Sequence, residues 1–411
     1  MSSYSSFVAS ISKLLLGSGM AQAITIMAMV VSARFYSPEN FSNYGVFVAT
    51  TSILLTFSTG RLDLALIQVS SLLEYKKILS TTMAILFVAA LFFVIFTSQV
   101  YDFGLGGRTL QLVFFGLIAN GVTQIYSNLY SSQERYGEIG LFRIFAALLF
   151  AIFSIGFAYF SVCVSEGLIL ASLASQVFTA FIFIARSKVQ LTLLRTKGFM
   201  SVMDEYRDYW TMDTISSLLN TIGRQLPIIV FPTMFGPVIA GYYFFSQRIV
   251  AAPVNLIANS VGNVFRKGAT IEYNDRGDFR SIFIFSFCRL FLIAMIGTIS
   301  ALLVIDENIV DLIFGEQWIG VTNILSMIIV FYAFKFVVSP LTYSLYVVRK
   351  LHWNLYGQFF YLACLFLPVV FGWYMGLDAQ LIIALHVFGA CISYTFYLVA
   401  SYYCAKKGRG L

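Results

Sequence analysis

The sequence is poor in ionisable side chains. Of its 411 residues only 11% are charged and only two are histidines, His352 and His386, whereas 59% are hydrophobic. Soluble domains carry roughly 25% charged residues, so this composition excludes a soluble globular protein. The two histidines stand alone in the sequence, which disfavours a metal site or a histidine-based proton relay.

Cysteine is also scarce. The chain has five cysteines, which are scattered and odd in number: Cys163, Cys288, Cys364, Cys391 and Cys404. We interpret them as reduced packing residues and expect neither a disulfide nor a metal site. No cofactor is expected either.

Long apolar segments dominate the chain instead. Segments of about 20 residues recur along its whole length, and each can cross a hydrocarbon core of about 30 Å as a helix. Unbroken apolar runs predict helices, because a membrane barrel would show short alternating segments. We therefore predict an all-α integral membrane protein with about twelve transmembrane helices, at approximately 11–34, 42–60, 78–100, 110–131, 141–161, 166–186, 211–234, 238–262, 281–304, 321–347, 355–374 and 379–403.

The longest polar connection, residues 187–209, divides these spans six and six. It predicts two six-helix lobes, residues 1–195 and 196–411. Because each half holds an even number of spans, duplicated halves would be related by an axis along the membrane normal. The largest connection on the other side, residues 306–320, is too small for a folded domain. A membrane glycan polymerase or ligase is therefore disfavoured, since such enzymes usually carry large external loops.

Basic residues concentrate in alternate connections. If the N-terminus is inside, about twenty of the 26 lysines and arginines lie on the inner side, which is a strong positive-inside signal. We expect both termini to be cytoplasmic. The formal net charge of +7 is then mainly a topology signal, and we expect no nucleic-acid partner.

Some basic residues nevertheless fall inside the predicted spans: Arg224, Arg248 and Lys335, with Arg289 at a shallower depth. At about 1.5 Å per residue, Arg224 lies roughly 18 Å from the inner end of its helix and Arg248 roughly 15 Å from the outer end of the next. No acid is found at that depth, because Asp63 and Asp213 lie near span ends and the other carboxylates lie in loops. Unpaired like charges in low dielectric cost several kcal/mol. We expect a hydrated cavity that receives an anion, and guanidinium groups bind phosphate in a bidentate manner.

Polar side chains also repeat at helical spacing. One stripe has a polar residue at every fourth position: Ser216, Asn220 and Arg224. The other stripes are Arg248, Asn255, Asn259 and Asn263; Asn120, Gln124 and Asn128; and Ser18, Gln22, Thr25 and Ser32. Amides both donate and accept, which suits sugar hydroxyls. The alternative is that such stripes only join helices. Likewise, Arg289 could reach the membrane surface along its apolar stem, and Lys335 could cap a broken helix near Pro340.

Three stretches resemble a known family: "GSGMAQAITIMAMVVSARFYSPENFSNYGVF", "EYRDYWTMDTISSLLNTIGRQLPIIVFPTMFGPVIAGYYFFSQRIVAAPVNLIANSVGNVF" and "LIFGEQWIG". The chain is similar in these to the Wzx-type O-antigen and polysaccharide flippases of the multidrug/oligosaccharidyl-lipid/polysaccharide (MOP) exporter superfamily. The resemblance implies a MOP/MATE-like fold, with two six-helix lobes around a central cationic cavity that opens alternately to either face. It also implies no enzymatic activity. The resemblance implies that the family's basic cavity residues correspond to Arg224, Arg248 and Arg34, the last of which lies in "SARFYSPE".

The implied cargo is an undecaprenyl-pyrophosphate-linked oligosaccharide, crossing the bacterial inner (cytoplasmic) membrane for synthesis of O-antigen, lipopolysaccharide or a related polysaccharide. A polysaccharide polymerase and a chain-length regulator are the further partners that the resemblance suggests. A lipid II flippase would have nearly the same composition and the same need to bind a lipid-linked anion, so it remains an alternative. A multidrug cation antiporter of the same superfamily is a second one, although it would be expected to need a deep carboxylate.

Overall fold

The computed structural model describes residues 2–69, 71–99, 107–161, 163–187, 199–348 and 350–406. It divides into two compact units, residues 1–230 and 231–411, which are described separately. The boundary expected from the sequence, between residues 195 and 196, lies outside the described residues. Every regular element in the described ranges is helical, as the sequence predicts.

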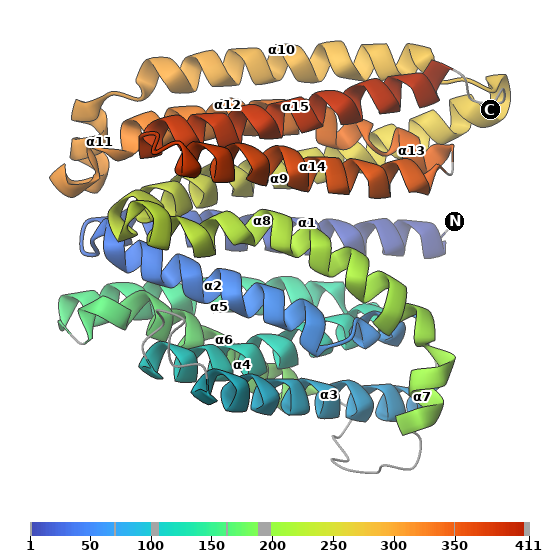
Figure 1. Ribbon diagram of the computed structural model, residues 1–411. Helices are drawn as coiled ribbons and strands as arrows, with labels where there is room; N and C mark the ends of the chain where they lie inside the picture. The colour runs from blue at the N-terminus through green and yellow to red at the C-terminus, as the bar shows by residue number, and fades with distance from the viewer. Residues whose placement is uncertain are drawn as a thin grey trace. The chain divides into compact units, whose positions relative to one another are not determined.

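Unit 1 is built from six long helices and the first part of a seventh (Figure 1). Its elements are α1 (Ser2–Ala33), α2 (Pro38–Ser58), η1 (Leu62–Gln68), α3 (Leu72–Gln99), α4 (Gly107–Ser132), α5 (Tyr136–Tyr159), η2 (Val164–Glu166), α6 (Gly167–Arg186), α7 (Phe199–Glu205), η3 (Tyr209–Asp213) and α8 (Thr214–Phe235). Helix α1 packs on α5, α5 and α4 pack on α6, and α3 and η1 pack on α4. The core of this unit centres on α3, α4 and α6, with Leu86, Tyr126 and Phe183 fully buried.

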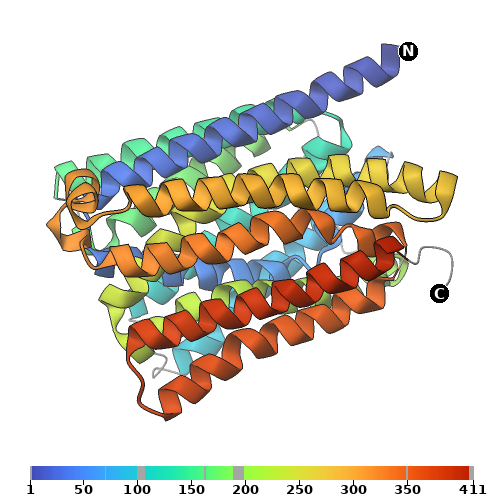
Figure 2. The same cartoon turned by 90° about the horizontal axis from the view of Figure 1, so that it is seen from above.

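Unit 2 begins near the end of α8 and continues with α9 (Pro237–Arg276), α10 (Arg280–Val304), α11 (Glu307–Phe314), η4 (Glu316–Trp318), α12 (Val321–Leu341), α13 (Ser344–Val347), α14 (Leu351–Tyr374) and α15 (Ala379–Lys406). Helix α12 lies among α9, α10 and α15, and α14 packs on α15 (Figure 2). Trp318, the last residue of η4, is fully buried against Phe245.

Proline and glycine mark several of the helix boundaries. Pro38 is the first residue of α2, and proline suits this position because the N–H that it lacks would be unpaired there. The preceding Ser37 caps the helix, since its side chain accepts a hydrogen bond from the backbone N–H of Asn40. Pro237 opens α9 in the same way, and Gly277 ends it in the left-handed conformation, with φ of 81°.

One boundary differs clearly from the sequence prediction. Helix α9 was expected to end near residue 262, but it continues to Arg276 over 40 residues and passes through Pro253. The expected end reflects the fall in hydropathy after residue 262. A helix does not stop where hydropathy falls, because its backbone hydrogen bonds continue until a breaker such as Gly277 appears.

Nine of the described helical segments are long and apolar enough to cross a membrane. They lie in α1, α3, α4, α5, α6, α10, α12, α14 and α15, and the chain is therefore a multi-pass membrane protein. The other three expected spans are the helices α2, α8 and α9, which have 21, 22 and 40 residues. Arg224 lies in α8 and Arg248 lies in α9. Both arginines are therefore in helices that are less apolar than the nine segments above.

Candidate functional site

Helix α8 carries Arg224 and Asn220, and both side chains are exposed. Within unit 1, neither side chain forms a hydrogen bond or ion pair with any residue that the structure describes. The helix is fixed through other side chains: buried Thr221 lies 3.3 Å from Thr56 of α2, measured between the two hydroxyl oxygens. Asp213, the last residue of η3 and the one directly before α8, pairs with Arg61. Helix α8 is thus fixed to its own unit through Thr221 and the preceding Asp213, which leaves the Arg224 guanidinium available to a ligand.

Helix α9 presents a second exposed guanidinium, that of Arg248. Among the described residues of unit 2, it has no hydrogen-bond or ion-pair partner. Asn259 is exposed and Asn255 is half-buried, and their amides are not hydrogen-bonded in the described part of the unit either. The helix contacts its neighbours through different positions, such as Gly262, which lies against the Tyr343 ring. These amides therefore do not join helices within unit 2.

Lys335 and Arg34 lie in different settings. Lys335 is half-buried on α12, with Nζ 5.0 Å from the ring centroid of Tyr332, which is the geometry of a cation–π contact. Helix α12 runs through Pro340 to Leu341. Arg34 is exposed in the turn that follows α1, so it stands beyond the helix end at Ala33.

Arg289 differs from the other arginines in the spans. It is exposed on α10, and its guanidinium carbon lies 3.9 Å from the ring centroid of Phe285, one turn earlier on the same helix. This stacking satisfies part of the charge locally. Arg289 is therefore a natural reference residue for the arginines of α8 and α9.

Two of the polar stripes are used inside the protein. In the stripe of α1, Arg143 of α5 donates to the hydroxyl of Ser18 over 2.7 Å, and Ser32 donates to Ser154 of α5 over 3.2 Å. This is the helix-joining role. In the stripe of α4, Asn120 donates to the carbonyl oxygen of Gly116 in its own helix, over 2.8 Å.

The rest of the α4 stripe binds a residue to which the sequence analysis assigns no role. Asp63 lies in η1 with no exposed surface. Its Oδ2 accepts a hydrogen bond of 2.8 Å from Gln124 and one of 2.7 Å from Asn128. The expectation that Asp63 simply lies near a span end misses this burial. The signal available in the sequence is the single acid within "LDLALIQ", together with the amide stripe that follows after one intervening helix.

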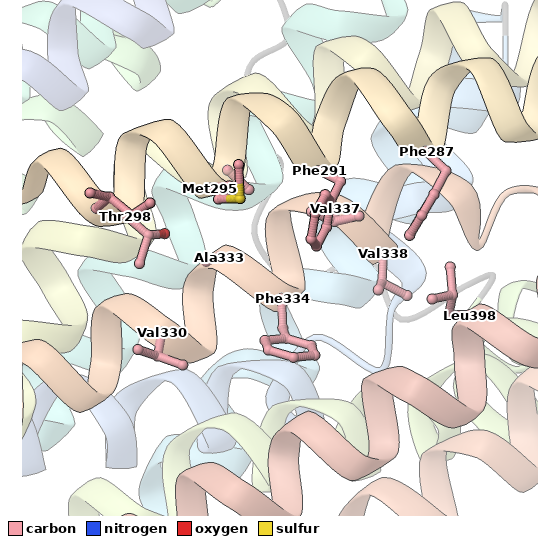
Figure 3. A pocket seen from close by; sticks show the side chains of 12 residues that line it. Phe287, Phe291, Met295, Thr298, Val330, Ala333, Phe334, Val337, Val338 and Leu398 are labelled. Atoms are coloured by element: carbon pink, nitrogen blue, oxygen red, sulfur yellow. The ribbon is translucent and has the colours of Figure 1, made fainter.

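Unit 2 also contains an apolar pocket of about 260 Å³. Phe287, Phe291 and Met295 of α10 line it on one side, and Phe334 of α12 and Leu398 of α15 line it on the other (Figure 3). Among the described residues, Thr298 is the single polar residue in its lining, and no charged side chain lines it. Such a pocket suits an apolar chain and cannot neutralise a phosphate.

Comparison with solved structures gives the fold. The lipid II flippase MurJ in its inward closed conformation matches with a TM-score of 0.74 and 12% identity, over 96% of this chain and 90% of that one. An inward-facing multidrug resistance MATE family transporter of the MOP superfamily matches with a TM-score of 0.70 and 13% identity, over 97% and 99% of the two chains. A MOP superfamily transporter from Pyrococcus furiosus matches with a TM-score of 0.58 and 11% identity, over 97% and 96%. The predicted MOP/MATE-like fold is confirmed.

Comparison by sequence gives the family. No curated protein sequence matches the chain. A family model described as "Polysaccharide biosynthesis protein" matches residues 31–323, which include α2 to α11 and therefore both Arg224 and Arg248. The match extends over well more than half of the 411 residues. The chain belongs to this polysaccharide biosynthesis protein family of membrane proteins with the MOP fold.

Proposed function

We propose that this protein is a flippase for an undecaprenyl-pyrophosphate-linked oligosaccharide, the repeat unit of O-antigen or of a related surface polysaccharide. It moves this lipid across the bacterial cytoplasmic membrane by alternating access, with both termini in the cytoplasm. The polysaccharide family and the fold shared with MurJ support the proposal. The observation that carries it is the pair of exposed guanidinium groups, Arg224 and Arg248, which are unpaired among the described residues of their own units.

In this proposal the arginines bind the pyrophosphate. A guanidinium donates two parallel hydrogen bonds to phosphate oxygens, and each charge-assisted bond contributes about 1.5–3 kcal/mol. Arg224 of unit 1 and Arg248 of unit 2 each supply such a group, and Lys335 and Arg34 add positive charge. Because the substrate leaves with the covalent structure it had on entry, no catalytic residue is required and the protein is not an enzyme.

The sugars are assigned to the amides that are not engaged within their own unit. Asn220, Asn255 and Asn259 each offer donors and an acceptor, as sugar hydroxyls require. Gln124 and Asn128 are excluded from this role because Asp63 already engages them. The lipid tail stays in the bilayer, and the product is passed to a polysaccharide polymerase with its chain-length regulator.

Complementation tests the proposal and separates it from its rivals. The gene is expressed in strains that lack a defined surface-polysaccharide flippase and, separately, in a strain depleted of its lipid II flippase. We expect restored surface polysaccharide in at least one strain of the first kind. Rescue of the lipid II strain alone would reassign the cargo to lipid II. Drug resistance without rescue of either kind would indicate a multidrug transporter.

A further inference from the structure

The apolar pocket of unit 2 opens toward the hydrocarbon of the membrane. Only 11% of the residues in the α10 span are buried. The lining residues Phe291, Met295 and Phe334 are exposed at 51%, 44% and 44%, although all three lie within membrane-spanning helices (Figure 3). Apolar side chains that are exposed in a span meet lipid tails, whereas a water-filled cavity is lined by polar groups. The occupant of this pocket therefore comes from the bilayer.

Two cationic side chains lie at one end of the helices that line the pocket. Arg280 is the first residue of α10, and it shares a helix face with Phe287, which follows about two turns later. Lys406 is the last residue of α15. The two helix ends are joined, because the backbone N–H of Phe279 donates to the carbonyl oxygen of Ala405 over 3.2 Å. Arg280 and Lys406 each follow one partner of this bond directly, so both cations lie where α10 meets α15.

An aromatic contact connects this cationic end to the pocket. The guanidinium carbon of Arg280 lies 5.9 Å from the ring centroid of Tyr402 on α15, within the range of a cation–π contact. The pocket residue Leu398 precedes Tyr402 by one turn of the same helix. The contact therefore holds the guanidinium on the side of α10 that faces α15, at the end of the seam that contains the pocket.

The charges of both cations are available to a ligand. Arg280 and Lys406 are exposed, and neither side chain has a hydrogen-bond or ion-pair partner in the part of unit 2 that the structure describes. The nearby carboxylate of Glu272 is already engaged: it pairs with Arg276 over 3.6 Å and accepts a backbone N–H at the start of α10. Asp278 is exposed and forms no ion pair with Arg280. This end of the seam is therefore a site for an anion.

We propose that the seam binds one anionic phospholipid of the bilayer, with its phosphate at Arg280 and Lys406 and an acyl chain in the pocket. Along α10, Phe287 lies about 10 Å from Arg280 and Thr298 about 27 Å. One leaflet of the hydrocarbon core is about 15 Å thick. An acyl chain that begins below the headgroup thus reaches Phe287 and Phe291 and ends inside the pocket.

The charge of the site selects the class of lipid. A zwitterionic phospholipid brings its own ammonium group, which two cations repel, whereas an anionic one brings only negative charge. The transported lipid is a different molecule in this account, because its pyrophosphate is assigned to Arg224 and Arg248 within α8 and α9. The phospholipid site therefore does not rest on the proposed function.

Lipid binding to the delipidated full-length protein in detergent tests the site. Native mass spectrometry compares phosphatidylglycerol with phosphatidylethanolamine of the same acyl chains. We expect the first phosphatidylglycerol to bind roughly tenfold more tightly, since two cations at the surface each favour the anion several-fold. The double variant with Arg280→Gln and Lys406→Gln should lower this preference to about twofold or less. Two controls should keep it: Arg289→Gln, on the opposite face of α10, and Lys267→Gln, an exposed cation of α9.

A phosphatidylglycerol with a photoreactive group in the middle of one acyl chain locates the tail. We expect its main cross-links in residues 287–298 of α10 and 330–338 of α12. The proposal is wrong if the two phospholipids bind equally to the wild-type protein, if the double variant keeps the preference, or if the cross-links fall outside the pocket. Displacement by undecaprenyl phosphate at equal concentration would also overturn it, because the pocket would then belong to a polyprenyl chain.

Discussion

Arg61 forms an ion pair with Asp213, with 2.9 Å between Nε and Oδ2, although 152 positions separate the two residues. Arg61 holds this position with a left-handed backbone, φ of 54°, directly after Gly60 with φ of 52°. The pair joins the residue before η1 to the end of η3, which leads directly into α8, the helix that carries Arg224. Both side chains are partly exposed, at 27% and 44%, which limits the strength of the pair.

This geometry predicts an unusual ranking of variants. Both Arg61→Ala and Arg61→Gly remove the ion pair. Arg61→Ala keeps a Cβ on a residue with left-handed backbone angles, whereas Arg61→Gly removes the steric strain that this Cβ causes. We expect Arg61→Gly to be more stable than Arg61→Ala by about 1 kcal/mol, and the coupling between Arg61→Ala and Asp213→Ala to stay below about 1 kcal/mol. Thermal unfolding of the two single variants and a double-mutant cycle measure these differences. Equal stability of the Ala and Gly variants would contradict the backbone argument.

A close helix contact in unit 2 gives a second prediction. A Cβ at Gly389 of α15 would overlap the backbone carbonyl of Cys364 in α14, whereas one at Gly297 of α10 would meet no atom within 4 Å. We expect Gly389→Ala to destabilise the protein by about 1–3 kcal/mol or more, because backbone must move. Gly297→Ala should be neutral or stabilising by up to about 1 kcal/mol, since alanine favours helix. Unfolding midpoints that fall equally for both would contradict this packing.

The helix inventory could largely be predicted from the sequence, because a bilayer demands long apolar helices wherever the chain crosses it. The length of α9 could not, since its last residues are polar and only Gly277 ends it. The burial of Asp63 could not either. It depends on η1 packing against α4, a tertiary contact that brings Asp63 to Asn128 across 65 positions. Residue spacing also does not reveal which polar stripes join helices. The stripe of α1 forms hydrogen bonds with α5, whereas the amides of α9 form none within the described part of unit 2, and both stripes have the same helical spacing.

Water access to α9 distinguishes a ligand-binding face from a lipid-facing one. In a background without native cysteines, Asn255→Cys and Asn259→Cys should react rapidly with a membrane-impermeant thiol reagent. Ile257→Cys is the matched control, because Ile257 is also exposed, at 46%, but points to the other side of the helix. We expect at least a tenfold slower reaction there. Equal rates at the three positions would contradict a hydrated amide face.

Membrane orientation follows from the distribution of lysine and arginine. Reporter fusions placed at helix ends and loops should be cytoplasmic after Arg276 and Lys350, and external after Pro237, Glu316 and Asp378. Paired phosphatase and fluorescent-protein fusions measure the side directly. The reverse pattern, with Arg276 external, would overturn the expected cytoplasmic termini.

The central claim is that Arg224 and Arg248 bind the pyrophosphate of the transported lipid. Its most direct test is a flipping assay in proteoliposomes with a fluorescent undecaprenyl-pyrophosphate-linked oligosaccharide, in which dithionite or a lectin reports the leaflet of the lipid. We expect Arg224→Gln and Arg248→Gln to lower the rate at least tenfold at normal protein levels, and Arg224→Lys to restore part of it, because lysine keeps the charge without the planar fork. Arg289→Gln, the matched control with its ring contact on α10, should flip at the parental rate. Parental rates for both Arg224→Gln and Arg248→Gln would contradict the account.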